Sequence, residues 1–264
     1  MCLAHQIKKK GVRVPAESVS EKAIWQALVT APKIDALSGQ SVLEDWVLEN
    51  ASKPIALTEW NLNTWFAGEA RAAQPKNRFL AYGLGAASYL HAILRRSDQI
   101  QIANQSMLAG TGWGITGIRI DTTEQLRPRM FPTAMVTGLY SRHHGSQLME
   151  LKARDVVYFE QPLRLTNIMS AKRVAEQDIV ATACKDYYYL HVLSRSFDKE
   201  RQIRINFPDR VGAVYQHWLL SDRVNGAKSP YAAIEELEGT AAGKDVVVTL
   251  PPRSVSVFRF KKKP

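Results

Sequence analysis

The pattern of secondary structure changes near residue 145, and this change limits the folds that the chain can adopt. Before residue 145, amphipathic helical segments alternate with short apolar strands, whereas short β-rich runs separated by turn residues follow it. Alternation of helices and strands is typical of an α/β unit with parallel strands. Closely spaced short strands indicate an antiparallel β-sandwich. We therefore expect two domains, residues 1–145 and residues 146–264.

The first 145 residues favour the order helix, helix, strand, helix, strand, loop, helix. Apolar side chains such as Ile24 and Leu28 recur at helical spacing, and Ser18 or Ser20 can cap the first helix. The expected helices are residues 21–30, 38–52, 77–98 and 131–145, and the expected strands are residues 55–60 and 99–104.

The second part consists of runs rich in β-branched and aromatic residues. In the last run, Val255 and Val257 compete with Phe258 and Phe260 for the inner face of one strand, because successive side chains point to opposite faces. The expected strands are residues 147–151, 155–159, 178–184, 187–195, 201–207, 213–220, 245–250 and 254–260.

The net charge of +10 does not by itself predict a nucleic-acid partner. Residues 1–150 carry 16 Lys and Arg against 12 Asp and Glu, and residues 151–264 carry 19 against 13, so the excess is spread evenly. The dense runs Lys8–Lys10 and Lys261–Lys263 lie near the termini, where solvated tails are the ordinary explanation. We expect no nucleic-acid partner.

The sequence contains no signal for a membrane, a secretion route or a redox site. No stretch approaches the roughly 18 consecutive apolar residues of a membrane span, and no apolar segment of a signal peptide follows the first lysines. Cys2 and Cys184 are expected to be free thiols, since neither has a partner at metal-site spacing. We expect a cytoplasmic protein with no metal and no cofactor.

The segment "PIALTEWN", residues 54–61, is the strongest candidate for a functional site. Its apolar strand ends in Glu59, and in parallel α/β folds ligands meet the carboxyl ends of the strands. Indole rings and amides suit sugars, because rings stack on sugar faces and amides bond to hydroxyl groups. A carboxylate there can attack an anomeric carbon. The accompanying candidates for substrate binding are Trp60, Asn61, Trp65, Asn104 and Gln105.

A structural explanation of the same residues stays open at this point. Glu59 can be a strand-end acid that caps the next turn, with the tryptophans in the core, and amides after a strand commonly form turns. The adjacent His143 and His144 cannot chelate one ion together on a helix. For His91, His191 and His217 we expect solvated or core positions. The glycine-rich loop at residues 108–117 lacks the Lys and Ser or Thr of a phosphate loop.

Four collinear segments resemble glycoside hydrolase family 51, the α-L-arabinofuranosidases. "KPIALTEWN" resembles the nucleophile segment on strand seven of the family's (β/α)8 barrel, and residues 78–104 are similar to helix seven and strand eight. Residues 130–151 resemble the last barrel helix and the entry to the sandwich. "VVVTLPPRSVSVFRF" resembles the closing strands of that sandwich. The similarity extends from about Ile24 to Phe260.

The resemblance implies a retaining hydrolase that removes arabinofuranosyl residues from oligosaccharides or hemicellulose, with Glu59 as its nucleophile. Asn104 and Gln105 would lie beside the substrate, and residues 146–264 would form the accessory sandwich. Only two barrel strands precede the sandwich, and no residue matches the Asn-Glu pair that carries the acid/base in this clan. We therefore expect the C-terminal part of such an enzyme, a truncated chain that needs a complementing barrel half or forms homo-oligomers.

A non-catalytic function remains as the alternative. The sandwich could bind carbohydrate or act as an assembly module through exposed aromatic side chains, which would be Trp113, Tyr187 to Tyr189 and Trp218. The two hypotheses differ in which substitution abolishes sugar binding, Glu59 or the aromatic residues.

Overall fold

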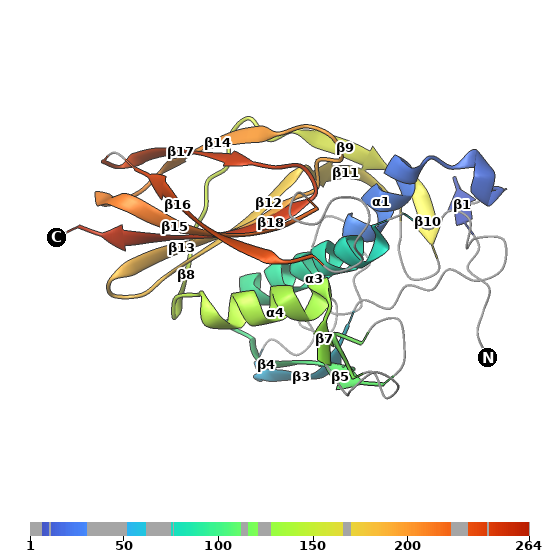
Figure 1. Cartoon of the computed structure of the whole chain (residues 1–264), viewed down its shortest axis with the longest axis horizontal. Coiled ribbons are helices and arrows are strands. Elements are labelled where there is room, and N and C mark those ends of the chain that lie inside the picture. Colours follow the sequence, from blue (N-terminus) through green and yellow to red (C-terminus); the bar gives the residue numbers. More distant parts are fainter. Residues whose placement is uncertain are drawn as a thin grey trace.

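The computed structural model places a layer of helices between a β-sandwich and a layer of short strands (Figure 1). None of the described helices is long and apolar enough to cross a bilayer. The structure describes residues 7–10, 12–30, 52–61, 75, 77–111, 116–120, 128–165, 170–222, 232–241 and 243–263.

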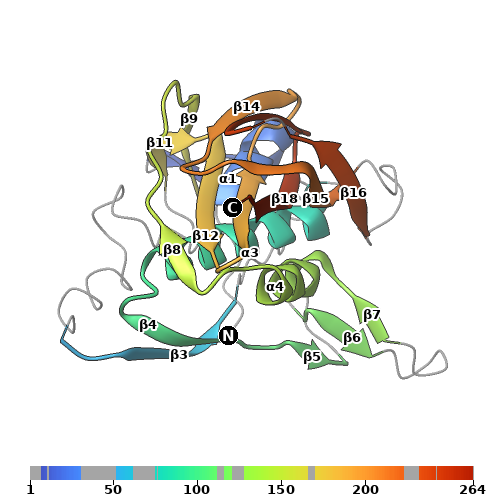
Figure 2. The ribbon, with the colours of Figure 1, turned by 90° about the vertical axis from the view of Figure 1, so that its left-hand side faces the viewer.

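The sandwich expected after residue 145 is confirmed. One sheet has six antiparallel strands in the order β16-β15-β18-β13-β12-β8. Its strands are β8 (Gln147–Met149), β12 (Gln177–Ala183), β13 (Tyr187–Ser194), β15 (Val211–Ser221), β16 (Ile234–Thr240) and β18 (Ser254–Lys262). One face of this sheet packs on the paired strands β14 (Arg201–Asn206) and β17 (Asp245–Leu250), with a buried cluster between them. A further pair, β9 (Tyr158–Gln161) and β11 (Ala171–Ala175), lies beside them (Figure 2).

The two apolar sets of strand β18 enter two different buried clusters. Phe258 and Phe260 enter the cluster between the sheets, and Val255 and Val257 enter the cluster beneath the helices. Both sets are buried, because β18 is a central strand of the sheet and both of its faces are covered.

Three helices cover the other face of the six-stranded sheet: α1 (Glu21–Thr30), α3 (Arg78–Arg95) and α4 (Pro132–Arg142). Of the two expected caps, Ser18 and Ser20, Ser20 caps α1, since its Oγ accepts a hydrogen bond from the Ala23 amide at 3.3 Å. Pro132 is the first residue of α4. The helices share one buried cluster with Leu193 and Leu220 of the sheet. This buried cluster therefore contains residues from both sides of residue 145. The domain boundary at that position stays a prediction.

A β-α-β unit lies on the far side of the helices (Figure 2). Strands β3 (Ile55–Trp60) and β4 (Ile100–Gln105) are parallel neighbours connected through α3, as the sequence predicts. The short strands β5 (Ala109–Gly110), β6 (Ile118–Ile120) and β7 (Pro128–Met130) form a second small sheet in this layer.

Several elements differ from the sequence expectations. The run Lys8–Lys10 is not a solvated tail, because β1 (Ile7–Lys9) pairs with β10 (Leu163–Leu165) and β2 (Val12–Arg13). Strand β18 likewise extends through Lys262. A short 3-10 helix, η1 (Ala16–Ser18), precedes α1. Strand β16 was not predicted, because it is an edge strand whose acidic sequence lacks the β-rich pattern of the other strands. The helix expected at residues 38–52 lies outside the described residues.

Candidate active site

The carboxyl ends of β3 and β4 bring the predicted site residues to one place. In the register of the pair, Leu57 lies beside Ala103 and Trp60 lies beside Gln105. Two residues of β3, Thr58 and Glu59, therefore lie opposite the single residue Asn104. Such a β-bulge changes the direction in which the following side chain points.

The bulge gives Glu59 and Trp60 different surroundings. Trp60 is only 4% exposed and stacks on Tyr89 of α3, with ring centroids 5.5 Å apart and planes 26° apart. Glu59 and Asn104 are exposed. Since Ile55 and Trp60 pack beneath α3, we infer that Glu59 and Asn104 lie on the face of the pair turned away from the helix. Only one face of β3 is buried, although a continuous apolar run such as residues 55–57 is typical of parallel strands that are buried on both faces.

The two strand ends are joined by polar contacts. Asn61 Nδ2 donates to the Ser106 carbonyl at 2.7 Å, and the Ser106 amide donates to the Trp60 carbonyl at 2.9 Å. These bonds fix the chain directly after Glu59. Within the described residues, Glu59 itself forms no hydrogen bond or ion pair, so its carboxylate is available to a ligand.

Gln105 has an unusual environment beside this junction. Its side-chain oxygen and nitrogen are buried, and neither has a hydrogen-bond partner among the residues that the structure describes; the same holds for Trp60 Nε1. An unpartnered buried amide is costly, which makes it a candidate for contact with a ligand. Trp65, the remaining predicted site residue, lies outside the described part of the chain.

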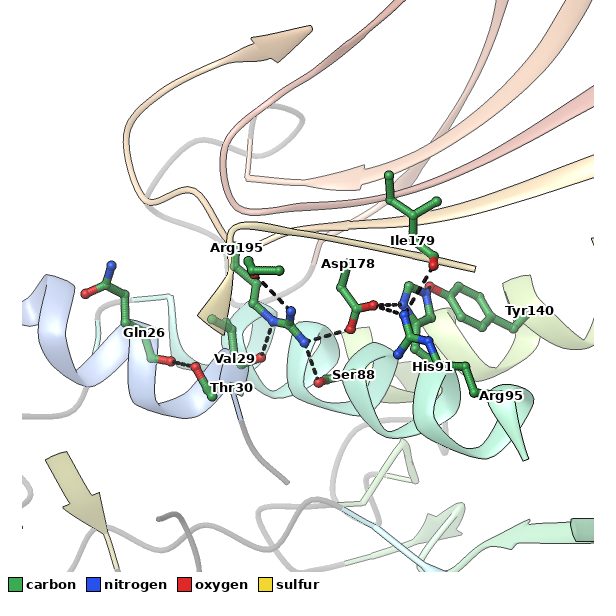
Figure 3. A network of polar contacts seen from close by, with 11 residues as sticks. Gln26, Val29, Thr30, Ser88, His91, Arg95, Tyr140, Asp178, Ile179 and Arg195 are labelled. Atoms are coloured by element: carbon green, nitrogen blue, oxygen red, sulfur yellow. Dashed lines mark hydrogen bonds and ion pairs between the residues drawn. The ribbon is translucent and has the colours of Figure 1, made fainter. Parts of the chain in front are cut away.

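A second polar cluster, which the sequence did not predict, lies between α3 and the sandwich (Figure 3). Asp178 at the start of β12 accepts hydrogen bonds from Arg195 Nη2, at 2.8 Å, and from Arg95 of α3. His91 Nδ1 lies 3.3 Å from Asp178 Oδ1, and His91 Nε2 lies 2.8 Å from the Tyr140 hydroxyl of α4. We call these five residues the Asp178 network.

Burial and charge determine the protonation states in the Asp178 network. Burial alone would raise the pKa of the Asp178 carboxyl, but Arg195, together with His91 and Arg95, holds this pKa well below its usual value. Burial lowers the pKa of His91 despite the nearby Asp178. Burial also raises the pKa of Tyr140 well above its usual value. The network therefore contains an ionised carboxylate, two guanidinium groups, a neutral imidazole and a neutral phenol.

His191 and His217 occupy buried positions. His191 Nε2 donates to the His143 carbonyl at 2.8 Å, and burial lowers the pKa of His191 to about 3. His217 lies 2.9 Å from Ser256 Oγ, and burial lowers the pKa of His217 to about 4. Within the described residues, no three His, Cys, Asp or Glu side chains are grouped to hold a metal ion. Cys184 is a free thiol, and Cys2 lies outside the described residues.

The aromatic surface expected for a binding module is largely absent from the described sandwich. Tyr188, Tyr189 and Trp218 are buried, and only Tyr187 is half-exposed. Trp218 is covered by His143, with ring centroids 3.7 Å apart, and by the Arg259 guanidinium. The prediction that Tyr188, Tyr189 and Trp218 are exposed is therefore wrong, because these side chains complete the packing of the sheet. Trp113 lies outside the described residues.

Comparisons with known proteins identify the fold. No protein family matches the sequence, and no curated protein matches it. The structure of an α-L-arabinofuranosidase from Thermotoga maritima, in complex with arabinose, matches with a TM-score of 0.67 and 17% identity, over 92% of this chain and 50% of that chain. A family 51 α-L-arabinofuranosidase from Thermotoga petrophila matches with a TM-score of 0.61 and 18% identity, over 84% and 45%.

A glycosidase of another family shares the architecture. The family 44 xyloglucanase from Paenibacillus polymyxa matches with a TM-score of 0.56 and 12% identity, over 98% of this chain and 45% of that chain. This chain thus spans about half the length of these three structures. In fold, it is similar to a C-terminal portion of the family 51 α-L-arabinofuranosidases, as its sequence resemblance predicts.

Proposed function

We propose that this chain is the nucleophile-bearing part of a retaining glycoside hydrolase of the α-L-arabinofuranosidase type. The observation that carries this proposal is the position of Glu59, an exposed carboxylate at the carboxyl end of β3, opposite Asn104 across a bulge. The substrate class is an arabinose-containing oligosaccharide or hemicellulose. The likeness to a structure that holds arabinose supports this choice.

In the proposed reaction, Glu59 attacks the anomeric carbon and forms a covalent glycosyl-enzyme intermediate. A second carboxyl group, about 5 Å from the first, protonates the leaving oxygen and then activates water. The Asn104 amide bonds to a sugar hydroxyl, and Gln105 supplies a second amide at the same strand end. Trp60 and Asn61 act through the position of this strand end, because Tyr89 covers the Trp60 ring and Ser106 binds the Asn61 amide.

We assign the second carboxyl group to a complementing barrel half. Parallel sheets are normally covered on both faces, yet within the described residues β3 and β4 form a two-stranded parallel sheet in which Ile102 is 53% exposed. A polypeptide with further parallel strands would cover this face and extend the sheet. Homo-oligomerisation through the same face is the competing arrangement, and the molar mass from light scattering separates the two.

The test is covalent labelling by an arabinofuranose-configured cyclophellitol probe in the presence of an N-terminal barrel half supplied in trans. We expect mass spectrometry to find the label on Glu59, and Glu59→Gln to abolish it. The matched control is Glu160→Gln, which removes another exposed strand carboxylate, on β9. Label on another residue, or undiminished labelling of Glu59→Gln, would refute the assignment.

Turnover by the chain alone is a separate measurement. We expect the 264-residue chain to release little nitrophenol from a nitrophenyl arabinofuranoside, because no residue of the chain matches the Asn-Glu pair that would carry the acid/base. Brisk hydrolysis without a companion would show that the second carboxylate belongs to this chain.

A further inference from the structure

Helix α3 has two opposite faces that contact different parts of the molecule (Figure 2). Ala86, Tyr89 and Ile93 pack against β3 and β4. Ser88, His91 and Arg95 belong to or contact the Asp178 network on the sandwich side. At 3.6 residues per turn, these two sets lie on opposite sides of the helix. The helix is therefore in contact with the β3–β4 pair on one side and with the Asp178 network on the other.

Arg195, which follows β13, connects four elements through one side chain (Figure 3). Its Nε donates to the Val29 carbonyl near the end of α1 at 3.1 Å, and its Nη1 donates to the Ala175 carbonyl of β11 at 3.1 Å. Its Nη2 donates to Ser88 Oγ of α3 and to Asp178 Oδ2, both at 2.8 Å. A guanidinium offers five donors in a fixed planar geometry, so these bonds fix the relative positions of the elements.

Asp178 makes this arrangement possible, since it is the anionic partner of both Arg195 and Arg95. Asp178 and Arg195 are buried, and a buried charge is tolerated only when it is paired and hydrogen-bonded. Loss of the Asp178 charge would leave the Arg195 guanidinium buried without its counter-ion. The bond to Ser88 of α3 depends on the same guanidinium.

The contact of the candidate site with the rest of the described molecule passes mainly through α3. The buried cluster beneath the helix contains Ile55 and Trp60 of β3 and Ile100 of β4, together with side chains of α3. Because Trp60 stacks on Tyr89, α3 contacts the residue that directly follows Glu59 in the chain. A continuous set of contacts thus leads from Asp178 through α3 to the end of β3.

We propose that Asp178 and Arg195 are positioning residues for the candidate site, which hold α3, and through it the strand end with Glu59, against the sandwich. The inference of a catalytic consequence rests on the proposed function, whereas the mechanical coupling does not. The sandwich is then required for the order of the site and is more than an appended domain.

The test compares amide hydrogen exchange of the full chain with that of Asp178→Asn, which keeps the shape of the side chain and removes its charge. We expect amides of β3 and β4, which open locally, to exchange at least about tenfold faster. Amides at the centre of β18 should also exchange faster, because they report the global loss of stability. A role limited to local packing and global stability would leave the local opening of β3 and β4 unchanged. The matched control is Asp198→Asn, which removes an exposed partner of Lys22 and should leave all of these rates unchanged.

Ser88→Ala is the second variant, because it removes one bond of Arg195 and leaves both charges. We expect the same pattern with a smaller increase, about two- to fivefold, even if Asp178→Asn does not fold. Unchanged exchange in β3 and β4 of folded Asp178→Asn, or of Ser88→Ala in its place, would overturn the proposal. If probe labelling of Glu59 fails in every variant while the exchange pattern appears, the proposed function fails and the positioning role stands.

Discussion

The two faces of α3 meet very different environments. The face toward the sandwich meets a covered interface, where the buried Asp178 and Arg195 form an ion pair and the buried His91 lies beside Asp178 and the Tyr140 hydroxyl. On the other side, α3 covers only one face of β3 and β4, and the second face exposes Ile102 and Glu59. Between α3 and the sandwich, charged groups are thus buried and paired. On the open face of β3 and β4, where we place a partner and a substrate, an apolar and an acidic side chain are exposed.

This difference separates stability from function. A variant in the covered interface changes the free energy of unfolding, because it removes a partner from a buried group. A variant on the open face should change little in the isolated chain, because nothing in the described structure covers that face. The contrast is what the following predictions test.

Acidification should have the largest effect, because it acts together on buried groups on both faces of the six-stranded sheet, His191 against Tyr140 of α4 and His217 against Phe258 between the sheets. The pKa is lowered from 6.5 to about 3 for His191 and to about 4 for His217 in the folded state. Below pH 6.5 the unfolded chain binds protons that the folded chain does not bind, so stability falls as the pH falls toward these values. Each unit of pKa difference corresponds to about 1.4 kcal/mol. The free energy of unfolding should therefore decrease by several kcal/mol between pH 7 and pH 4.

Urea denaturation at pH 7, 6, 5 and 4 measures this dependence. Asp178 contributes to this pH dependence only at lower pH, because the pKa of its carboxyl is lowered from 3.8 in the folded state. Its contribution to the free energy of unfolding is therefore lost as the pH falls below 3.8. His217→Asn should flatten the dependence, since the substituted side chain takes up no proton. An equal slope for wild type and His217→Asn would contradict the role of burial.

Asp178→Ala should have the next largest effect. The substitution leaves Arg195 buried without its carboxylate, and removal of one partner from a buried pair typically costs about 3–5 kcal/mol. Asp198→Ala, which breaks the exposed contact with Lys22, should cost about 1 kcal/mol or less. Urea denaturation of both variants at pH 7 measures the difference. Similar decreases in the free energy of unfolding for the two variants would mean that water reaches the interface around Asp178.

The sequence predicted the elements that local patterns determine. Apolar spacing predicted α3, and a cap at Ser18 or Ser20 predicted the start of α1. The apolar strands on either side of α3 predicted the parallel pair that brings Glu59 near Asn104. The bulge that turns Trp60 toward Tyr89 depends on the register between the strands, which neither strand specifies alone. Its effect on the site could therefore not be predicted.

The Asp178 network could not be predicted from the sequence either, because its members are far apart in the chain. Its members come from α3, α4, β12 and the segment after β13, and Ser88 and Arg195 are 107 residues apart. No spacing rule connects such positions. Isolated histidines in the sequence were correctly expected to include core positions, but the carboxylate and guanidinium groups that accompany His91 become visible only after the helices are packed on the sheet.

Two isoleucines of β4 provide the smallest and most direct comparison of the faces. Ile100 is 5% exposed beneath α3, whereas Ile102 is 53% exposed on the open face. Ile100→Ala should lower the free energy of unfolding by about 2–4 kcal/mol, through lost burial and the cavity that remains. Ile102→Ala should cost less than about 1 kcal/mol, because little apolar area is removed from the core.

The same pair distinguishes an open face from a covered one in solution. If a second copy or a complementing barrel half covers β3 and β4, Ile102 becomes buried in the assembly, and Ile102→Ala should weaken that association. Denaturation curves at several protein concentrations, with and without the companion, measure this. A loss for Ile102→Ala equal to that for Ile100→Ala at the lowest concentration would mean that this face is already covered within the single chain, and the proposed partner would have no surface to bind.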